Sequence, residues 1–184
     1  MGWRDWRAVT ASGRCAAGRS ARTAGLDCPR HRKHLQSSLL QAPDGWTLKG
    51  VCDRAILAVL LYHGLRREEA AHLTTSDLQD RRGIKNLQVR GKVGKTRYLP
   101  LHPVSAERIH AYLEPDIQRE PGPGPLFRSI RGRTTGTGIC PDGIYKVVAQ
   151  WAKAADIHIE GLGVHGLRAT TATNALEHVE GGGP

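Results

Sequence analysis

The sequence has 184 residues and a formal net charge of +10, with 39% hydrophobic and 24% charged residues. This composition is typical of a soluble globular protein, and the length allows one domain with a core or one domain plus an unfolded arm. No apolar stretch approaches the roughly 18 to 20 residues of a membrane span, so we expect a soluble protein in the cytoplasm.

The positive charge is unevenly distributed along the chain. Residues 1–36 contain eight Lys and Arg against two Asp, whereas the remaining residues contain 19 basic against 15 acidic side chains. A net positive charge favours a polyanionic partner such as DNA, but the body of the chain is only mildly basic. Specific residues must therefore carry any argument for nucleic-acid binding.

Residues 1–36 contain almost no large aliphatic side chains, so we expect a disordered basic arm preceding a domain over residues 37–184. The arm either contacts DNA or has no role of its own. The cysteines form no Cys-x-x-Cys pair and no dense framework, which favours a reducing compartment and no metal site. The four cysteines are Cys15, Cys28, Cys52 and Cys140.

Organised structure is predicted to begin near Leu39, and residues 48–63 form the clearest helix. They are apolar on nearly every side and free of proline, which is typical of a helix buried on all faces. Gly64 is expected to end this helix. A second, shorter helix is predicted over residues 66–73, followed by a turn over 74–77.

Two short strands, residues 85–89 and 97–101, are predicted to form a hairpin around a glycine-flanked cationic tip. Pro103 is expected to begin a helix that Pro115 ends. Residues 121–138 are rich in Pro, Gly and Thr and are expected to form a loop.

Two further helices are predicted after that loop. The first begins at Pro141, and its apolar residues are spaced for burial; the second covers about residues 165–180. The chain is therefore predicted to be mainly α-helical with a small antiparallel β-sheet, an α+β fold.

Three short motifs have residues suited to binding a phosphate. Arg66 follows the break after the buried helix, and its planar guanidinium can contact two phosphate oxygens at once. The hairpin tip carries Lys92 and Lys95, with Arg97 in the next strand. His165 and Arg168 are three residues apart, so they share one face at the start of the last predicted helix.

The order of these motifs resembles the catalytic domain of tyrosine recombinases of the phage integrase family. The matching segments are Gly-Leu-Arg with a Glu three residues after the Arg, then Gly-Lys-x-Gly-Lys before Leu-Pro-Leu, then His-x-Leu-Arg before Ala-Thr. Each motif is weak alone, but three in the family's order make a strong joint signal. The resemblance covers about residues 39–180.

The resemblance implies a DNA breaking and rejoining site with double-stranded DNA as partner, and other recombinase protomers as further partners. Arg66 and Arg168 would bracket the scissile phosphate and stabilise its transition state. Lys92 would protonate the leaving 5′ hydroxyl, with Lys95 the second choice, and His165 would bind the phosphate and transfer protons. Glu69 would support the helix junction, and Lys95 and Arg97 would contact DNA. No metal or other cofactor is implied.

One departure from the family pattern concerns the nucleophile. The family places a tyrosine on a late helix, and its hydroxyl forms a 3′ phosphotyrosyl link. All four tyrosines here precede His165, so we expect an incomplete, C-terminally truncated catalytic domain that does not cleave DNA alone. They are Tyr62, Tyr98, Tyr112 and Tyr145. Two alternatives stay open: a non-catalytic DNA-binding remnant or regulator, and an unrelated soluble protein in which the motifs coincide.

Overall fold

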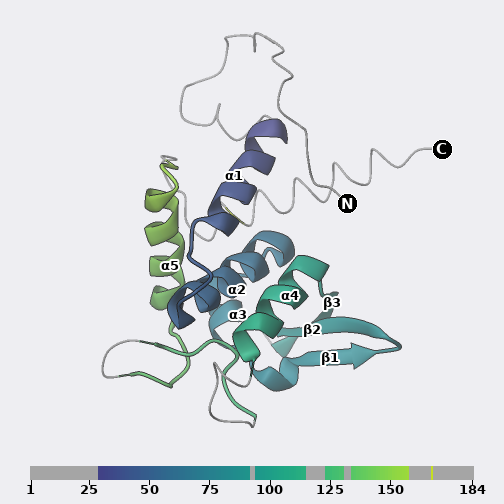
Figure 1. Cartoon of the computed structure of the whole chain (residues 1–184). Coiled ribbons are helices and arrows are strands. Elements are labelled where there is room, and N and C mark those ends of the chain that lie inside the picture. The colour runs from purple at the N-terminus through teal and green to yellow at the C-terminus, as the bar shows by residue number, and fades with distance from the viewer. Residues whose placement is uncertain (1–28, 92–93, 115–122, 131–133, 158–166, 168–184) are drawn as a thin grey trace, which may run out of the picture.

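The computed structural model describes residues 29–91, 94–114, 123–130, 134–157 and 167 (Figure 1). Helices surround a central helix, and a three-stranded sheet lies to one side, which confirms the predicted mainly α fold with a small antiparallel sheet. The elements in chain order are helices α1 (Pro29–Gln41), α2 (Leu48–His63) and α3 (Arg67–Ala71), the 3-10 helix η1 (Thr75–Asp77), strands β1 (Leu78–Arg81), β2 (Ile84–Arg90) and β3 (Thr96–Pro100), and helices α4 (Pro103–Leu113) and α5 (Pro141–Ala154).

Helix α2 is the centre of the core. Its start is capped by Thr47, whose side chain accepts a hydrogen bond from the Gly50 backbone N–H at 3.1 Å. It ends at Gly64, which adopts the left-handed conformation with φ of 58° that glycine tolerates best. Every residue from Ala55 to Leu61 is buried, so the prediction of a helix with apolar residues on all sides is confirmed.

Helices α1 and α4 pack against α2, and α1 begins earlier than expected. The expected disordered arm ended at residue 36, but α1 starts at Pro29. Its C-terminal residues Leu39 and Leu40 are buried in the core, and Arg108 of α4 donates to the Leu40 carbonyl at 2.9 Å. Burial of these two leucines and the hydrogen bond from Arg108 thus stabilise the C-terminal end of α1, a helix that the composition of the segment did not indicate.

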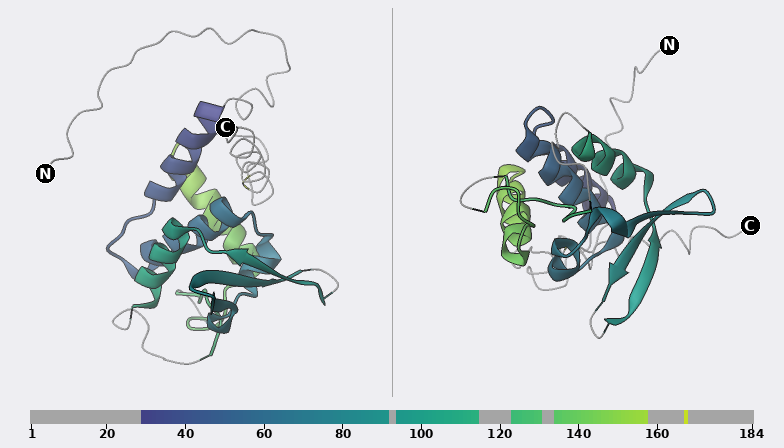
Figure 2. Two further views of the ribbon diagram at one scale, coloured as in Figure 1. Left: turned by 90° about the vertical axis from the view of Figure 1, so that its right-hand side faces the viewer. Right: turned by 90° about the horizontal axis from the view of Figure 1, so that it is seen from below.

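The sheet has the order β1-β2-β3, with both pairs antiparallel. The β2–β3 hairpin confirms the prediction, but β1 was not expected. This strand is mostly polar and only four residues long. It forms because residues 78–81 pair with residues 84–87 across a two-residue turn. The turn residues, Arg82 and Gly83, both have positive φ, as tight hairpin turns require. The β1–β2 turn and the β2–β3 turn lie at opposite ends of the sheet (Figure 2).

The segment before α5 forms a loop, as predicted, but it is anchored by backbone pairing. Thr74 and Pro125 form one isolated bridge, and Arg128 and Gly138 form another. Helix α5 then runs from Pro141 to Ala154 with its apolar face buried, and Ala155 caps its end. Of the last predicted helix, only Leu167 lies within the described residues; it is helical and fully buried.

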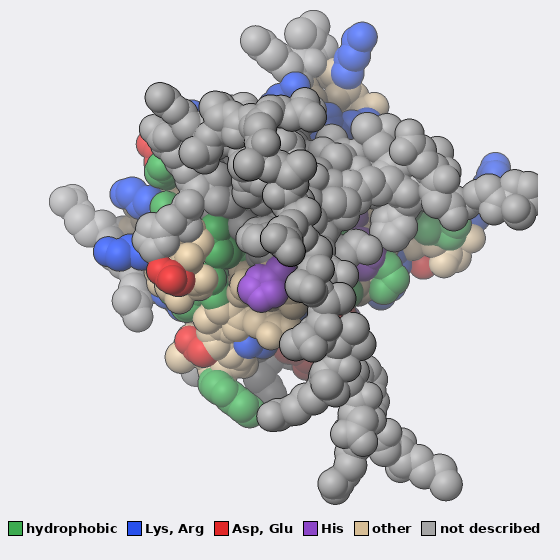
Figure 3. Space-filling model, turned by 90° about the horizontal axis from the view of Figure 1, so that it is seen from above, with side chains coloured by type: hydrophobic (Ala, Val, Ile, Leu, Met, Phe, Trp, Pro, Cys, Tyr) green, Lys and Arg blue, Asp and Glu red, His purple; other side chains and the backbone are tan. Residues whose placement is uncertain are grey.

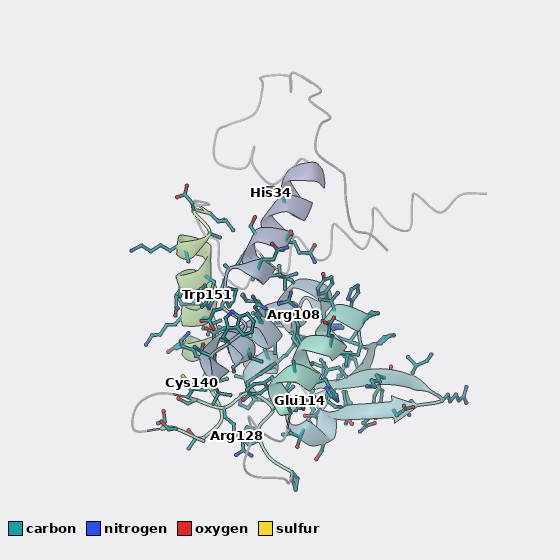
Figure 4. The ribbon with its side chains drawn as sticks, viewed as in Figure 1. His34, Arg108, Glu114, Arg128, Cys140 and Trp151 are labelled. Atoms are coloured by element: carbon teal, nitrogen blue, oxygen red, sulfur yellow. The ribbon has the colours of Figure 1, made fainter. Side chains whose placement is uncertain are left out.

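A buried carboxylate links α5 to α2 on the side of α2 away from the sheet. Asp53 is 3% exposed and accepts a hydrogen bond from the Trp151 indole Nε1 at 2.7 Å and another from Lys49. Trp151 points from α5 toward α2 in Figure 4. Lys49 also lies over the Trp151 ring, 5.6 Å from its centroid. A buried charge needs such partners, so this group fixes how the two helices pack.

We predict that Trp151→Phe lowers the free energy of unfolding by about 1.5–3 kcal/mol, because it keeps an aromatic ring but removes a hydrogen bond to a buried carboxylate. Urea denaturation followed by circular dichroism measures the change. Trp46→Phe is the matched control, because Trp46 is 97% exposed and should change stability little. Equal effects of the two substitutions would contradict the assigned role of the Asp53 link.

Candidate functional site

Arg66 lies at the junction of α2 and α3, where the chain changes direction. Gly64 turns the backbone, Leu65 is fully buried, and Arg66 is in an extended conformation as the N-cap residue of α3. The buried leucine fixes the backbone next to an arginine whose side chain is 45% exposed. The guanidinium is thus presented to solvent from a rigid support.

Glu69, one turn into α3, is the partner of Arg66. Its carboxylate accepts a hydrogen bond from the Arg66 backbone N–H at 2.8 Å and one from Arg66 Nη1 at 3.0 Å. The first of these satisfies a free N–H group at the start of α3, as in a capping box. The expected supporting role of Glu69 agrees with this geometry.

Glu69 also binds an arginine that is 28 residues away in the sequence. Arg97 of β3 donates from Nη1 to Oε1 at 3.1 Å and from Nη2 to Oε2 at 2.9 Å, a two-point interaction of the guanidinium with the carboxylate. The Glu69 side chain is only 5% exposed, and that of Arg97 is 38% exposed. We call Arg66, Glu69 and Arg97 the Arg66–Glu69–Arg97 cluster.

The cluster keeps Glu69 ionised. Burial of the carboxylate acts to raise its pKa, but hydrogen bonds from Arg97 and Arg66 outweigh this effect and hold the pKa of Glu69 below its usual value. One negative charge therefore lies between two positive ones, and the cluster as a whole keeps a charge of +1. It remains attractive to a phosphate.

The β2–β3 hairpin starts beside the cluster. A Cβ atom on Gly91 would lie 3.2 Å from the Lys95 carbonyl oxygen, 3.7 Å from Arg97 Nη1 and 4.0 Å from Glu69 Oε1. The Gly91 N–H donates to the same Lys95 carbonyl at 2.8 Å, which closes the hairpin base. The backbone of Lys95, one of the predicted lysines, therefore lies at this hairpin base, and its side chain is exposed.

The other residues predicted for the site, Lys92, His165 and Arg168, lie outside the described residues. Leu167, between the last two, is buried in the same core as α2. Sequence analysis missed the pairing of Arg97 with Glu69, although one signal was available. Arg97 and Leu99 are two residues apart in a predicted strand, so they share one side of it, and an aliphatic Leu99 indicates the side that faces the protein.

In Figure 3, Lys and Arg side chains of the described residues are visible at separate places around the edge of the molecule. Among the described residues, no group of three His, Cys, Asp or Glu side chains is close enough to hold a metal ion. None of the described helices is both long and apolar enough to span a membrane.

Comparison with known proteins gives a consistent set of similarities. The sequence pattern of the Phage integrase family matches residues 32–180. The chain is 28% identical over 167 residues to a tyrosine recombinase XerD of Staphylococcus epidermidis, a match covering 85% of this chain and 54% of that protein. The chain thus spans about half the length of the curated relatives it matches.

Two solved structures have a similar fold. The crystal structure of XerA recombinase matches with a TM-score of 0.63 and 24% identity over 83% of this chain and 51% of that one. The crystal structure of XerH site-specific recombinase bound to palindromic difH substrate, a post-cleavage complex, matches with a TM-score of 0.66 and 20% identity over 83% and 42% of the two chains. Both support the fold described above.

We predict that Glu69→Gln lowers the free energy of unfolding at neutral pH by about 1–2 kcal/mol, a value reduced because both arginines are partly exposed to water. The folded-state pKa of Glu69 is depressed, so its stabilising effect is present above the unfolded pKa and is lost as pH falls through the folded pKa. Denaturant unfolding at a series of pH values should therefore show the two proteins converging in acid.

Glu68→Gln is the control for this experiment, because the Glu68 side chain is 54% exposed and pairs with an exposed Arg67. It should cost less than about 0.5 kcal/mol at every pH. A constant difference between Glu69→Gln and the unmodified protein across the acidic range would show that the charge of Glu69 is not what stabilises the junction.

Proposed function

The chain belongs to the phage integrase family, and on that premise we propose that it binds double-stranded DNA as part of a site-specific recombinase of the tyrosine type. The observation that supports this most directly is the Arg66–Glu69–Arg97 cluster. It presents a partly exposed guanidinium beside a cationic hairpin, and its net charge is positive. These are the properties that a binding site for one backbone phosphate needs.

Arg66 is proposed to bind the phosphate at which the DNA strand is exchanged. Its Nη1 donates to Glu69 at 3.0 Å, which restrains the guanidinium, and the side chain remains 45% exposed. Arg168 is proposed as the second arginine on the same phosphate, and His165 as a further ligand and proton-transfer group. Lys92 is proposed as the general acid for the leaving 5′ hydroxyl, with Lys95 beside it.

The proposed partners are DNA and other recombinase protomers, since lambda integrase, a protein of similar fold, has been solved bound to DNA and as a dimer bound to a core site. A bacterial nucleoid in the cytoplasm is the proposed location. We also propose that the Arg-rich residues before α1 extend the contact with DNA electrostatically, as a basic arm beside the recombinase-like domain.

The reaction of the family needs a tyrosine hydroxyl, and we propose that none of the four in this sequence supplies it. Tyr112 is 1% exposed and accepts a hydrogen bond from the Arg128 backbone N–H at 3.1 Å. The Tyr62 ring stacks on His102, and Arg81 lies over the Tyr98 ring. Tyr98 and Tyr145 are 42% and 48% exposed, but both precede His165 in the sequence, whereas the nucleophilic tyrosine of the family follows it. The 184-residue chain is therefore proposed to hold DNA without breaking it.

We predict that Arg66→Ala weakens binding of the chain to a DNA duplex about tenfold, because one charge-assisted contact to phosphate is lost. The slope of log affinity against log salt should become shallower by about one. Fluorescence anisotropy over a range of salt concentrations measures both. Arg82→Ala is the matched control, because Arg82 is exposed in the turn at the opposite end of β2. Equal effects of the two substitutions would refute the assignment of Arg66.

We also predict that the 184-residue chain forms no covalent link to DNA. A nicked duplex that traps phosphotyrosyl intermediates should give no slower band on a denaturing SDS gel. Appearance of such a band would overturn this part of the proposal, and peptide mapping of the adduct would then identify the attacking residue.

A further inference from the structure

The orientation of Arg97 is not that of a side chain reaching for DNA. Both of its terminal nitrogens donate to Glu69, at 3.1 and 2.9 Å, and it lies on the same side of β3 as the partly buried Leu99. A two-point pair of this kind orders both groups. To contact DNA with these nitrogens, Arg97 would first have to leave a carboxylate that is only 5% exposed.

Arg97 changes the net charge of the group of side chains around Arg66 that a ligand would approach. Arg66 and Glu69 alone would form a neutral pair, and the carboxylate would be free to bind Arg66 with both oxygens. With Arg97 present, each oxygen of Glu69 accepts from Arg97 as well, and the cluster keeps a charge of +1. Among the described residues, only Nη1 of the Arg66 guanidinium has a hydrogen-bond partner, and the side chain is 45% exposed, so Nε and Nη2 are left as donors for a ligand.

Arg97 also joins two parts of the site that are far apart in the sequence. Its strand carries one side of the β2–β3 hairpin, whose base at Gly91 lies against the Arg97–Glu69 contact. Glu69 belongs to α3, next to the Arg66 junction. The ion pair therefore joins the base of the hairpin to the helix that follows the Arg66 junction.

We propose that Arg97 is a positioning residue, which acts through Glu69 to keep Arg66 available for phosphate and to hold the hairpin beside it. This inference rests on the proposed function, namely phosphate binding by Arg66. Arg66 contacts the phosphate itself, whereas Arg97 acts only through Glu69, although the two arginine side chains are about equally exposed.

The test is a double-mutant cycle in the 184-residue chain, with binding of a DNA duplex measured as a function of salt. Arg97→Gln alone should weaken binding about three- to tenfold, as expected for residues coupled through a shared partner. In the Glu69→Gln background the same substitution should cost less than about twofold, because no carboxylate charge is left to neutralise. The salt slope should stay unchanged, whereas Arg66→Gln should reduce it by about one.

Arg97→Lys is the second variant, and it covers the case in which Arg97→Gln does not fold. Lysine keeps the charge but cannot form two parallel hydrogen bonds, so Arg97→Lys should weaken binding relative to the unmodified protein, by less than the three- to tenfold expected for loss of the charge. Circular dichroism confirms that each variant is folded before binding is measured.

Two results would overturn the inference. One is a salt slope that falls by about one in Arg97→Gln; the other is a loss of affinity that is the same with Glu69 and with Gln at position 69. Either would make Arg97 a direct contact to DNA. If instead Arg66→Gln leaves binding unchanged, the proposed function itself fails, and this outcome is separate from the other two.

Discussion

The carboxylate of Glu69 is the group on which the arrangement of this site depends. It accepts hydrogen bonds from the Arg66 backbone, the Arg66 side chain and both terminal nitrogens of Arg97, all between 2.8 and 3.1 Å. One side chain thereby caps a helix, orients an arginine and attaches a hairpin. Because the carboxylate is buried, loss of either arginine would leave its charge poorly compensated.

The rest of the described structure supports this group. Helix α2 is buried along most of its length and ends at Gly64, two residues before Arg66. On its other side, Asp53 binds Trp151 of α5, so the helix that precedes the junction is fixed by a second buried carboxylate. The body of the chain has only a small excess of positive charge. Affinity for DNA should therefore come from a few well-placed cations and not from the overall field of the protein.

Sequence patterns predicted the helices and the hairpin because each is specified locally. The apolar residues of α2 and α5, the glycine after α2 and the proline at the start of α4 all act over a few residues. Strand β1 and helix α1 were not predicted, because β1 depends on pairing with β2, and α1 depends on burial of Leu39 and Leu40. No local pattern indicates either contact.

The candidate site was predicted in part for the same reason. Arg66 and Glu69 are three residues apart on one helix start, a spacing that indicates contact. Arg97 and Glu69 are 28 residues apart, so their pairing follows from how β3 packs beside α3. Arg97 was predicted as a DNA contact from its charge and its place in the motif alone. In the structure, Arg97 forms a two-point ion pair with Glu69, which gives a structural reason for an arginine at this position.

The different roles of Arg66 and Arg97 are tested most directly by a two-dimensional ¹H–¹⁵N NMR spectrum of the arginine side-chain Nε–H groups, recorded while unlabelled duplex DNA is added. Arg66→Lys and Arg97→Lys would assign the two signals. We expect the Arg66 signal to shift as DNA binds and the Arg97 signal to stay in place, because the Arg97 guanidinium remains on Glu69. A shift of the Arg97 signal with no change in the Arg66 signal would contradict these roles.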